Sequence, residues 1–280
     1  MGPHAQFEVG NPGSLMRIVS LSKQYVQRRP LTRTPFAVCA LEDVNLTIHR
    51  GSTLAIVGES GAGKSTLAKC LALLERPTAG EIWFDGNNLL GLGKKALFPI
   101  HRQIQLIFQD PTSALNPRLT AEDIIGEPLA IQRIGTQDSR RIRTQELMEQ
   151  VGLPASSGHK RPLEFSGGQR QRLAIARALA LEPKLLILDE ALSSLDLLNQ
   201  QMILKLLADL RAAHSLTYVH ISHDLRLVSE FADEVAVMSQ RRIVEQKRAA
   251  ELFARPEHPD TKALLAAMPS LESICLRRLA

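Results

Sequence analysis

One short stretch of the chain, from Gly58 to Ser65, matches the phosphate-binding pattern G-x-x-x-x-G-K-[ST]. Its glycines let backbone N–H groups turn toward phosphate oxygens, and the start of a following helix adds positive potential. Lys64 can reach the β and γ phosphates of a nucleotide, and the Ser65 hydroxyl can bind Mg²⁺. We therefore predict a nucleotide site formed by Gly58, Glu59, Ser60, Gly61, Ala62, Gly63, Lys64, Ser65 and Thr66.

Two carboxylates, Asp189 and Glu190, follow the apolar run Leu185–Leu188. A fully apolar run of this length is typical of a parallel strand covered on both faces, and ligands of parallel sheets bind at the carboxyl ends of such strands. Asp189 is placed to hold Mg²⁺, and Glu190 to accept a proton from or orient an attacking water. A helix N-cap is the structural alternative for such a pair, and the phosphate-binding stretch in the same chain favours the catalytic interpretation.

A third motif, Phe165-Ser166-Gly167-Gly168-Gln169, precedes a long helical pattern. Alone it indicates a helix-capping turn with Ser166 as the N-cap. Together with the other two motifs it resembles the signature sequence of ATP-binding-cassette (ABC) ATPases, although Phe165 stands where that family usually has Leu. The resemblance covers about residues 17–269. It implies a head-to-tail dimer in which Ser166, Gly167, Gly168 and Gln169 face ATP held by the other subunit.

Three further residues occur in the order that this resemblance implies. Gln109, after the apolar run ending at Phe108, matches the glutamine that joins the Mg²⁺ shell and couples the nucleotide site to a helical subdomain. Asp196 matches the aspartate at the dimer interface. His223 matches the switch histidine that contacts the γ-phosphate. A structural role would be more usual for a lone Gln or His.

The same resemblance assigns an adenine-stacking aromatic residue to Tyr25. A flat aromatic ring suits a purine. The stretch from Val26 to Val38, which we expect to be a loop, is longer than expected for the family, and its Phe36 is an alternative stacking residue. A plain strand-edge position is the structural alternative for Tyr25.

Outside these motifs, short apolar strands alternate with helical patterns along the chain. This order predicts an α/β fold with a mostly parallel sheet flanked by helices. The resemblance makes it a P-loop NTPase of the RecA-like type, with an antiparallel β edge region and an inserted helical subdomain at about 110–181. We expect a flexible leader at 1–15, a nucleotide-binding domain at 16–250 and a C-terminal extension at 251–280. Because the extension contains several prolines, we expect it to dock only loosely on the main body.

The composition of the chain indicates a folded globular protein and gives no sign of a nucleic-acid surface, a disulfide framework or a membrane span. The chain has 280 residues, 44% hydrophobic and 22% charged, which is typical of a folded globular protein rather than a disordered one. A net charge of +5 is too small to indicate a nucleic-acid surface by itself. The three cysteines, Cys39, Cys70 and Cys275, have no pattern of a disulfide framework or zinc site. No apolar run approaches the roughly 18–20 residues of a membrane span.

Three segments resemble those of one branch of the family. Residues 109–118, Gln-Asp-Pro-Thr-Ser-Ala-Leu-Asn-Pro-Arg, resemble the segment after the Q-loop in oligopeptide, dipeptide and nickel importers, near the surface that contacts the membrane subunit. Residues 255–265 resemble their C-terminal extension. Ala191-Leu192 replaces the common Pro-Thr, a variant associated with the same importers. Cys275 alone cannot hold the iron–sulfur cluster of some peptide-type subunits, so none is expected.

The resemblance therefore implies an ATPase that uses ATP and Mg²⁺ to power peptide uptake. A nickel or metal-chelate importer is the alternative within the family, and a soluble ABC ATPase without a transport role is the alternative outside it. The implied partners are transmembrane permease subunits, a second ABC ATPase subunit and, indirectly, an extracytoplasmic solute-binding protein. For the two ATPase subunits, a heterodimer is favoured over a homodimer. Nucleic acid is not expected, and the expected location is peripheral, on the cytoplasmic face of the cell (inner) membrane.

Overall fold

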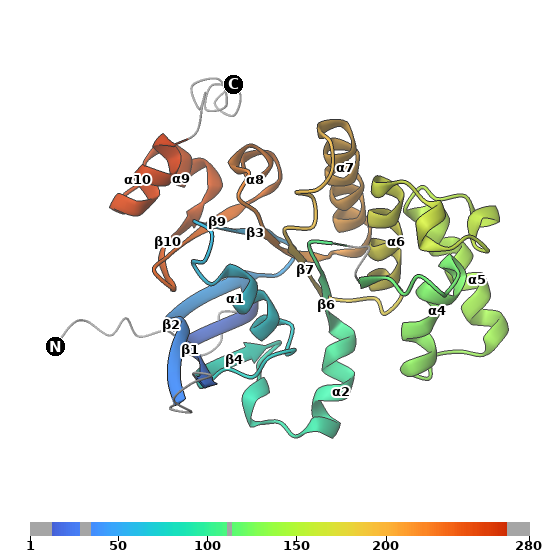
Figure 1. The fold of residues 1–280 in the computed structure, drawn as a ribbon, viewed down its shortest axis with the longest axis horizontal. Helices are drawn as coiled ribbons and strands as arrows, with labels where there is room; N and C mark the ends of the chain where they lie inside the picture. Colours follow the sequence, from blue (N-terminus) through green and yellow to red (C-terminus); the bar gives the residue numbers. More distant parts are fainter. Residues whose placement is uncertain (1–12, 29–34, 111–113, 268–280) are drawn as a thin grey trace.

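The computed structural model describes residues 13–28, 35–110 and 114–267, which form two β-sheets surrounded by helices (Figure 1). The strands are β1 Ser14–Arg28, β2 Pro35–His49, β3 Thr53–Val57, β4 Ala79–Phe84, β5 Asn87–Asn88, β6 Ile104–Ile107, β7 Leu185–Asp189, β8 Thr217–Ile221, β9 Glu234–Ser239 and β10 Arg242–Arg248. The helices are α1 Lys64–Leu71, α2 Lys94–Gln103, α4 Ala121–Ile131, α5 Gln137–Gln150, α6 Gly167–Leu179, α7 Leu197–His214, α8 Leu225–Phe231, α9 Ala249–Ala254 and α10 Pro259–Ala266. Three short 3-10 turns are η1 Leu89–Gly91, η2 Ala155–Ser157 and η3 Pro162–Glu164.

The larger sheet has the strand order β10-β9-β3-β8-β7-β6. Adjacent strands in this sheet are parallel except β9 and β10, which form an antiparallel hairpin. Every residue of β3, β7 and β8 is buried, because helices cover one face of the sheet and α1 together with the smaller sheet covers the other. Leu186 and Leu188 pack toward the helices that include α6 and α7, whereas Leu185 and Ile187 pack toward α1 and the smaller sheet. The predicted mostly parallel α/β sheet is confirmed.

The smaller sheet has the order β2-β1-β4-β5 and is antiparallel throughout, which confirms the predicted antiparallel edge region. The expected loop from Val26 to Val38 was wrong at both ends. Tyr25 pairs with Val38, and the ladder continues to Arg28 and Pro35. Pairing with the partner strand satisfies the backbone here, so strand structure persists where the side chains lack apolar alternation. Residues 29–34 lie outside the described residues.

Between β6 and β7 the chain forms a mainly helical unit on one side of the larger sheet (Figure 1). Its described part, from residue 114 onward, contains α4, α5, α6 and two 3-10 turns. A capping box formed by Thr120 and Asp123 starts α4, and Ser166 and Gln169 form another at the start of α6. Their apolar faces meet in a core with Ile125, Leu147 and other residues.

The C-terminal helices α9 and α10 pack firmly on the sheet, so the expected loose docking was wrong for the described part of the extension. Leu252 and Leu265 are buried against a cluster that includes Val235 and Val237 of β9. Pro259 stands at the first turn of α10, where its missing N–H costs nothing. The leader was predicted at 1–15, and this prediction was wrong at its end, because Ser14 begins β1 and Leu15 is buried in the core. Residues 1–12 and 268–280, including Pro269 and Cys275, lie outside the described residues.

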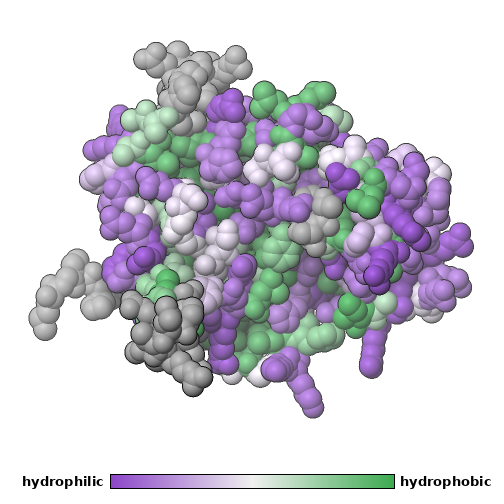
Figure 2. Space-filling view, in the orientation of Figure 1, coloured by the Kyte–Doolittle hydropathy of each residue, from purple (hydrophilic) through white to green (hydrophobic). Residues whose placement is uncertain are grey.

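The face of the molecule seen in Figure 2 is mostly hydrophilic, with apolar residues scattered between charged ones. Large apolar side chains that are exposed on the described part of the chain include Leu74, Phe108, Ile131, Leu197, Leu198 and Met202. None of the described helices combines the length and apolar character that a membrane crossing requires.

Candidate functional site

The loop from Gly58 to Gly63 joins β3 to α1 at the carboxyl edge of the larger sheet. Gly63 has φ +108°, and a Cβ added there would lie 2.5 Å from the carbonyl oxygen of Ala40. Only glycine fits this backbone position. The loop thereby leads directly into the first turn of α1, whose N–H groups have no partner within the helix and attract anions.

Lys64, the first residue of α1, is held over the loop by its own backbone. Its Nζ donates hydrogen bonds to the carbonyl oxygens of Gly58 and Glu59, both at 2.8 Å, and the residue is only 6% exposed. Burial lowers the pKa of Lys64, while Glu190 and Asp189 act in the opposite direction. An ammonium group has three N–H donors, so one beyond these two can bind a phosphate oxygen.

Ser65 and Asp189 meet although they are far apart in the sequence. The Ser65 hydroxyl donates to Oδ1 of Asp189 at 3.1 Å. Asp189 ends β7 and is 6% exposed; burial raises its pKa and Glu190 adds to the rise, while the Ser65 hydrogen bond opposes it. A buried carboxylate beside a hydroxyl is an oxygen pair of the kind that binds Mg²⁺ together with phosphate oxygens and water.

Glu190 occupies a strained backbone position next to this pair. Its φ of +49° is left-handed, which is uncommon outside glycine. The backbone is fixed by a hydrogen bond from Glu190 N–H to the carbonyl of Ile221 and by two from Ser193 to the carbonyl of Glu190. The exposed His223, after β8, has its Nδ1 3.6 Å from Oε2 of Glu190. The structure thus brings together Lys64, Ser65, Asp189, Glu190 and His223.

Gln109 is less closely involved. It is exposed just beyond β6, the strand that pairs with β7, and among the described residues it makes no hydrogen bond to Ser65 or Asp189. The Pro-Thr-Ser at 111–113, part of the importer-like segment, lies outside the described residues.

Tyr25 lies against α1 rather than in open solvent. Its hydroxyl donates to Oε2 of Glu75, and Nζ of Lys23 lies 4.9 Å from the centre of its ring. Burial and Glu75 raise the pKa of Tyr25. The alternative residue, Phe36, is exposed on β2, one pair along the ladder from Val26.

The signature turn forms a second cluster with the residues around Asp196. Ser166 and Gln169 cap α6 through two reciprocal hydrogen bonds, of 2.9 and 3.3 Å, and Phe165 is buried as an anchor. A Cβ added at Gly168 would lie 2.6 Å from Oδ1 of Asn199. Asp196 caps α7 by accepting from the backbone N–H of Asn199. Within the described residues, no hydrogen bond or ion pair joins this cluster to the phosphate loop.

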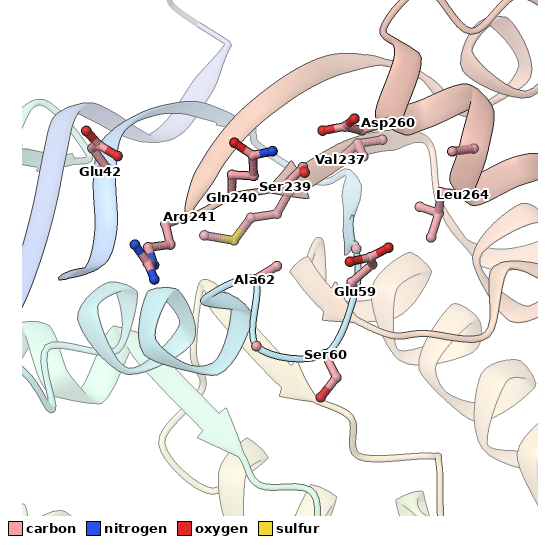
Figure 3. A pocket seen from close by; sticks show the side chains of 14 residues that line it. Glu42, Glu59, Ser60, Ala62, Val237, Ser239, Gln240, Arg241, Asp260 and Leu264 are labelled. Carbon is pink, nitrogen blue, oxygen red and sulfur yellow. The ribbon is translucent and has the colours of Figure 1, made fainter. Parts of the chain in front are cut away.

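A cavity of about 600 Å³ adjoins the phosphate loop on another side. The cavity is lined by residues of the loop, of the turn at 239–241 and of α10. Figure 3 shows Ala62 on the side of the loop that faces this turn and Asp260 and Leu264 of α10 beyond, whereas the Ser60 side chain points away from the turn. Neither Lys64 nor the two carboxylates at 189 and 190 line it. The residues that can act on a phosphate therefore lie outside this cavity.

Two positioning residues escaped the sequence analysis. Glu75 holds the Tyr25 hydroxyl, and no local pattern indicates this contact, which spans 50 residues. Asn199 packs on Gly168 and binds Asp196. Its spacing of three residues from Asp196 is a helix-capping signal that could have predicted the second contact.

Comparison with known proteins agrees with this geometry. Residues 41–193 match the protein family described as ABC transporter. The chain belongs to the ABC transporter family. It is 42% identical to the dipeptide transport ATP-binding protein DppF of Haemophilus influenzae, an alignment that covers 94% of this chain and 81% of that protein. It is also 42% identical to the oligopeptide transport ATP-binding protein OppF of Bacillus subtilis, covering 91% of this chain and 82% of that one.

Solved ABC transporter structures share the fold. A dimeric post-hydrolysis state of the ATP-binding cassette MJ0796, bound to ADP and Pi, has a TM-score of 0.74 and 29% identity, covering 84% of this chain and 98% of that chain. CbiO1 of Clostridium perfringens, part of the ABC transporter complex CbiONQ, has a TM-score of 0.74 and 28% identity, covering 96% and 100%. The P-loop NTPase fold and the ABC ATPase class predicted from the motifs are confirmed.

Proposed function

We propose that this chain is the ATP-hydrolysing subunit of an importer for dipeptides or oligopeptides and acts through separate transmembrane subunits. The observation that carries the proposal is the meeting of Lys64 and Ser65 with Asp189, Glu190 and His223 at one edge of the sheet. The peptide substrate is supported by the relatives, since DppF and OppF are named for dipeptide and oligopeptide transport.

In this proposal the phosphate loop binds the triphosphate of ATP. The backbone N–H groups of Gly58 to Ser65 and the start of α1 surround the β and γ phosphates. Lys64 adds a charge already held in place by two loop carbonyls, so little side-chain freedom is lost on binding. Thr66 completes the first turn, and Tyr25 stacks on adenine with its hydroxyl fixed by Glu75.

The residues present fit a bound Mg²⁺. Ser65 and Asp189 already lie 3.1 Å apart with one hydroxyl and one carboxylate oxygen, and Mg²⁺ commonly takes only one or two protein ligands beside phosphate oxygens and water. We assign Gln109 as a further ligand because β6 and β7 are neighbours and their carboxyl ends adjoin. When bound, the ion would neutralise charge on the transferring phosphoryl group.

Glu190 accepts a proton from the attacking water, whose oxygen bonds to the γ-phosphorus as the bond to the β,γ-bridging oxygen breaks, yielding ADP and phosphate. His223, 3.6 Å from Glu190, contacts the γ-phosphate and helps to orient the water. The left-handed backbone of Glu190 is a strained conformation of the kind found at functional sites, which supports a role in function rather than in packing.

The catalytic site is completed by a second subunit. Ser166, Gly167, Gly168 and Asp196 lie in a separate cluster, so they serve ATP only across a head-to-tail dimer. Exposed Leu197, Leu198 and Met202 beside Asp196 supply apolar surface for that contact. The dimeric MJ0796 structure supports the arrangement. We propose a second ABC ATPase subunit as the partner, preferably a different chain.

An apolar groove supports docking of a transmembrane subunit. A cavity of about 490 Å³ lies between the larger sheet and the helical unit and is lined by Leu74, Phe108, Leu115, Ile131 and other residues. Leu74, Phe108 and Ile131 are exposed there. We propose that this groove holds the chain peripherally on the cytoplasmic face of the membrane, with a solute-binding protein delivering peptide from the other side.

The test compares the wild-type protein with Glu190→Gln in source cells that lack the native copy. We expect the variant to bind ATP normally and to hydrolyse it about 100-fold or more slowly, because the proton acceptor is lost. Uptake of labelled short peptides should fall with it, while uptake of labelled nickel should not change. Glu149→Gln, an exposed carboxylate on α5, is the matched control.

Three outcomes would contradict the proposal. Hydrolysis within a few-fold of wild type would remove Glu190 from its role. Loss of nickel uptake alone would replace the peptide substrate with nickel. Unchanged uptake of both solutes, with hydrolysis abolished, would leave the ATPase standing and overturn peptide import.

A further inference from the structure

A small pocket of about 90 Å³ adjoins the proposed catalytic carboxylate on its inner side. It is lined by Glu190 and His223 and also by Gln200 of α7 and His220 of β8. Neither of the last two belongs to a recognised motif, and both are polar side chains within otherwise apolar packing. The pocket therefore joins the catalytic edge of the sheet to two buried polar groups.

His220 is an unusual residue for the centre of a parallel sheet. It is 1% exposed and lies on the same face of β8 as Tyr218, which is wholly buried. Its ring stands perpendicular to that of Phe231, with 5.9 Å between ring centres. Within the described residues neither Nδ1 nor Nε2 has a hydrogen-bond partner. A neutral imidazole needs one acceptor for its N–H and one donor for its other nitrogen.

Gln200 lines the same pocket and also has a polar atom without a hydrogen-bond partner among the described residues. It is 7% exposed, and its Nε2 donates to the carbonyl of Leu192 at 3.1 Å, which fixes the amide. Its Oε1 has no partner among the described residues. Three polar atoms on two side chains thus lack partners at one pocket. Buried polar groups in native proteins are almost always satisfied by protein or by water.

Water fits this pocket in size and chemistry. At roughly 30 Å³ for each molecule, it has room for about two or three waters. The pocket offers water both hydrogen-bond acceptors and a donor. Tyr218, on the same strand, needs no water, because its hydroxyl donates to the carbonyl of Leu207 at 2.9 Å. A pocket lined only by apolar atoms would instead stay dry.

The carboxylate of Glu190 needs further support. Its backbone is fixed, but among the described residues its side chain forms one ion pair, with the exposed His223 at 3.6 Å. A general base must be held to within a fraction of an ångström of the attacking water. A hydrogen bond from the pocket to the Glu190 carboxylate would hold it more firmly than the contact with His223 alone.

We propose that the pocket binds ordered water which links His220 and Gln200 to the carboxylate of Glu190 and holds that carboxylate in position for hydrolysis. The inference rests on the proposed role of Glu190. His220 and Gln200 act here as positioning residues, since they reach the reacting atoms only through water and Glu190.

His220 has the charge state that this role requires. Burial lowers its pKa to about 4, and Asp224, which also lines the pocket, acts in the opposite direction. The other titratable groups at the pocket are Glu190 and His223. A neutral ring offers one donor and one acceptor to water at neutral pH.

The experiment measures ATP hydrolysis by the full-length chain assembled with its proposed partner subunits and determines a crystal structure of the wild type. His220→Phe fills the pocket with an apolar ring, and His220→Gln keeps a donor and an acceptor. Tyr218→Phe is the matched control, because it removes a buried polar group from the same face of β8, outside the pocket. Gln200→Met serves as a second test if His220→Phe does not fold.

We expect water density in contact with His220 and Gln200. His220→Phe should lower kcat about ten-fold or more while leaving the KM for ATP within about two-fold, and His220→Gln should recover at least about half of the wild-type kcat. Tyr218→Phe should match the wild type. A dry pocket, or a wild-type kcat in His220→Phe, would overturn the inference. If His220→Phe does not fold, a wild-type kcat in Gln200→Met would overturn it instead.

Glu190→Gln, measured in parallel, separates this inference from the proposed function. If Glu190→Gln abolishes hydrolysis and His220→Phe does not change it, the water site alone fails. If Glu190→Gln keeps wild-type activity, the role of Glu190 fails and the positioning inference fails with it.

Discussion

Glu245 on β10 joins the C-terminal helices to the sheet, and we expect its replacement to lower the stability of the fold. It is 9% exposed and accepts the backbone N–H groups of Glu257 and His258, both at 3.0 Å. Nζ of Lys247 lies 3.1 Å away. The Thr261 hydroxyl is also adjacent, although its geometry falls short of a hydrogen bond.

Burial alone would raise the pKa of Glu245, but these donors outweigh burial and lower the pKa to about 2 from the ordinary 4.5. At 1.36 kcal/mol for each pKa unit, the ionised form stabilises the fold by at most about 3 kcal/mol at neutral pH. Glu245→Gln keeps the shape and one acceptor oxygen, so we expect a loss of about 1–3 kcal/mol. For a chain of this size that is a fall in Tm of roughly 3–9 °C.

The sign of the pH dependence follows from the lowered pKa. A carboxylate whose pKa is lower in the folded state stabilises the fold above the unfolded-state pKa, and this contribution disappears as the pH falls through the folded-state value. The Tm difference between wild type and Glu245→Gln should therefore be full at neutral pH. It should decrease from pH 4.5 toward pH 2, with about half or more of it gone at pH 3.

The assay is thermal unfolding by circular dichroism at several pH values. Glu257→Gln is the matched control, because it removes an exposed carboxylate from the same network, where it pairs with Lys247 at 2.7 Å. It should change Tm by no more than about 2 °C. A Tm for Glu245→Gln within about 1 °C of wild type at neutral pH, or a difference that stays constant with pH, would refute the reasoning.

Two further substitutions test the two halves of the nucleotide site. Lys64→Ala should weaken ATP binding about ten-fold or more in calorimetry, because it removes the charge held over the loop, and unchanged affinity would contradict the phosphate role. Gly168→Ala puts a Cβ 2.6 Å from Oδ1 of Asn199 and should lower stability by about 1–3 kcal/mol and weaken ATP-driven dimerisation on size exclusion. Gly167→Ala, with an ordinary contact at 3.9 Å, should keep the wild-type Tm, and equal melting of both variants would remove the steric argument.

Much of the fold was predictable because burial leaves a clear pattern. The mainly apolar strands β3 and β7 are covered on both faces, so both could be located from their runs of apolar residues. Helix α2 was not located, since none of its residues is fully buried and Pro99, a residue that usually interrupts a helix, stands inside it. The ends of β1 and β2 were missed for a related reason, because pairing between strands maintains them without apolar alternation.

The catalytic groups were recognisable one motif at a time, but their association was not. The Gly58–Ser65 pattern, the acidic pair at 189–190 and the Ser166–Gln169 cap each depend on residues a few positions apart. Their spacing reflects local turn and cap geometry, which a sequence displays directly. The roles assigned to them stay predictions until the substitutions above are measured.

By itself the sequence determined the phosphate loop, the central strands and the family. Only the tertiary structure decided which side chains meet. Ser65 contacts Asp189 across 124 residues, and His223 approaches Glu190, because the strand order places β3 beside β8 and β8 beside β7, so that their carboxyl ends form one edge. The pocket at His220 arises in the same way, from β8, the helices α7 and α8 and the segments that follow β7 and β8, which pack together only in the complete fold. Contacts of this kind depend on chain topology and long-range packing, which no local spacing records.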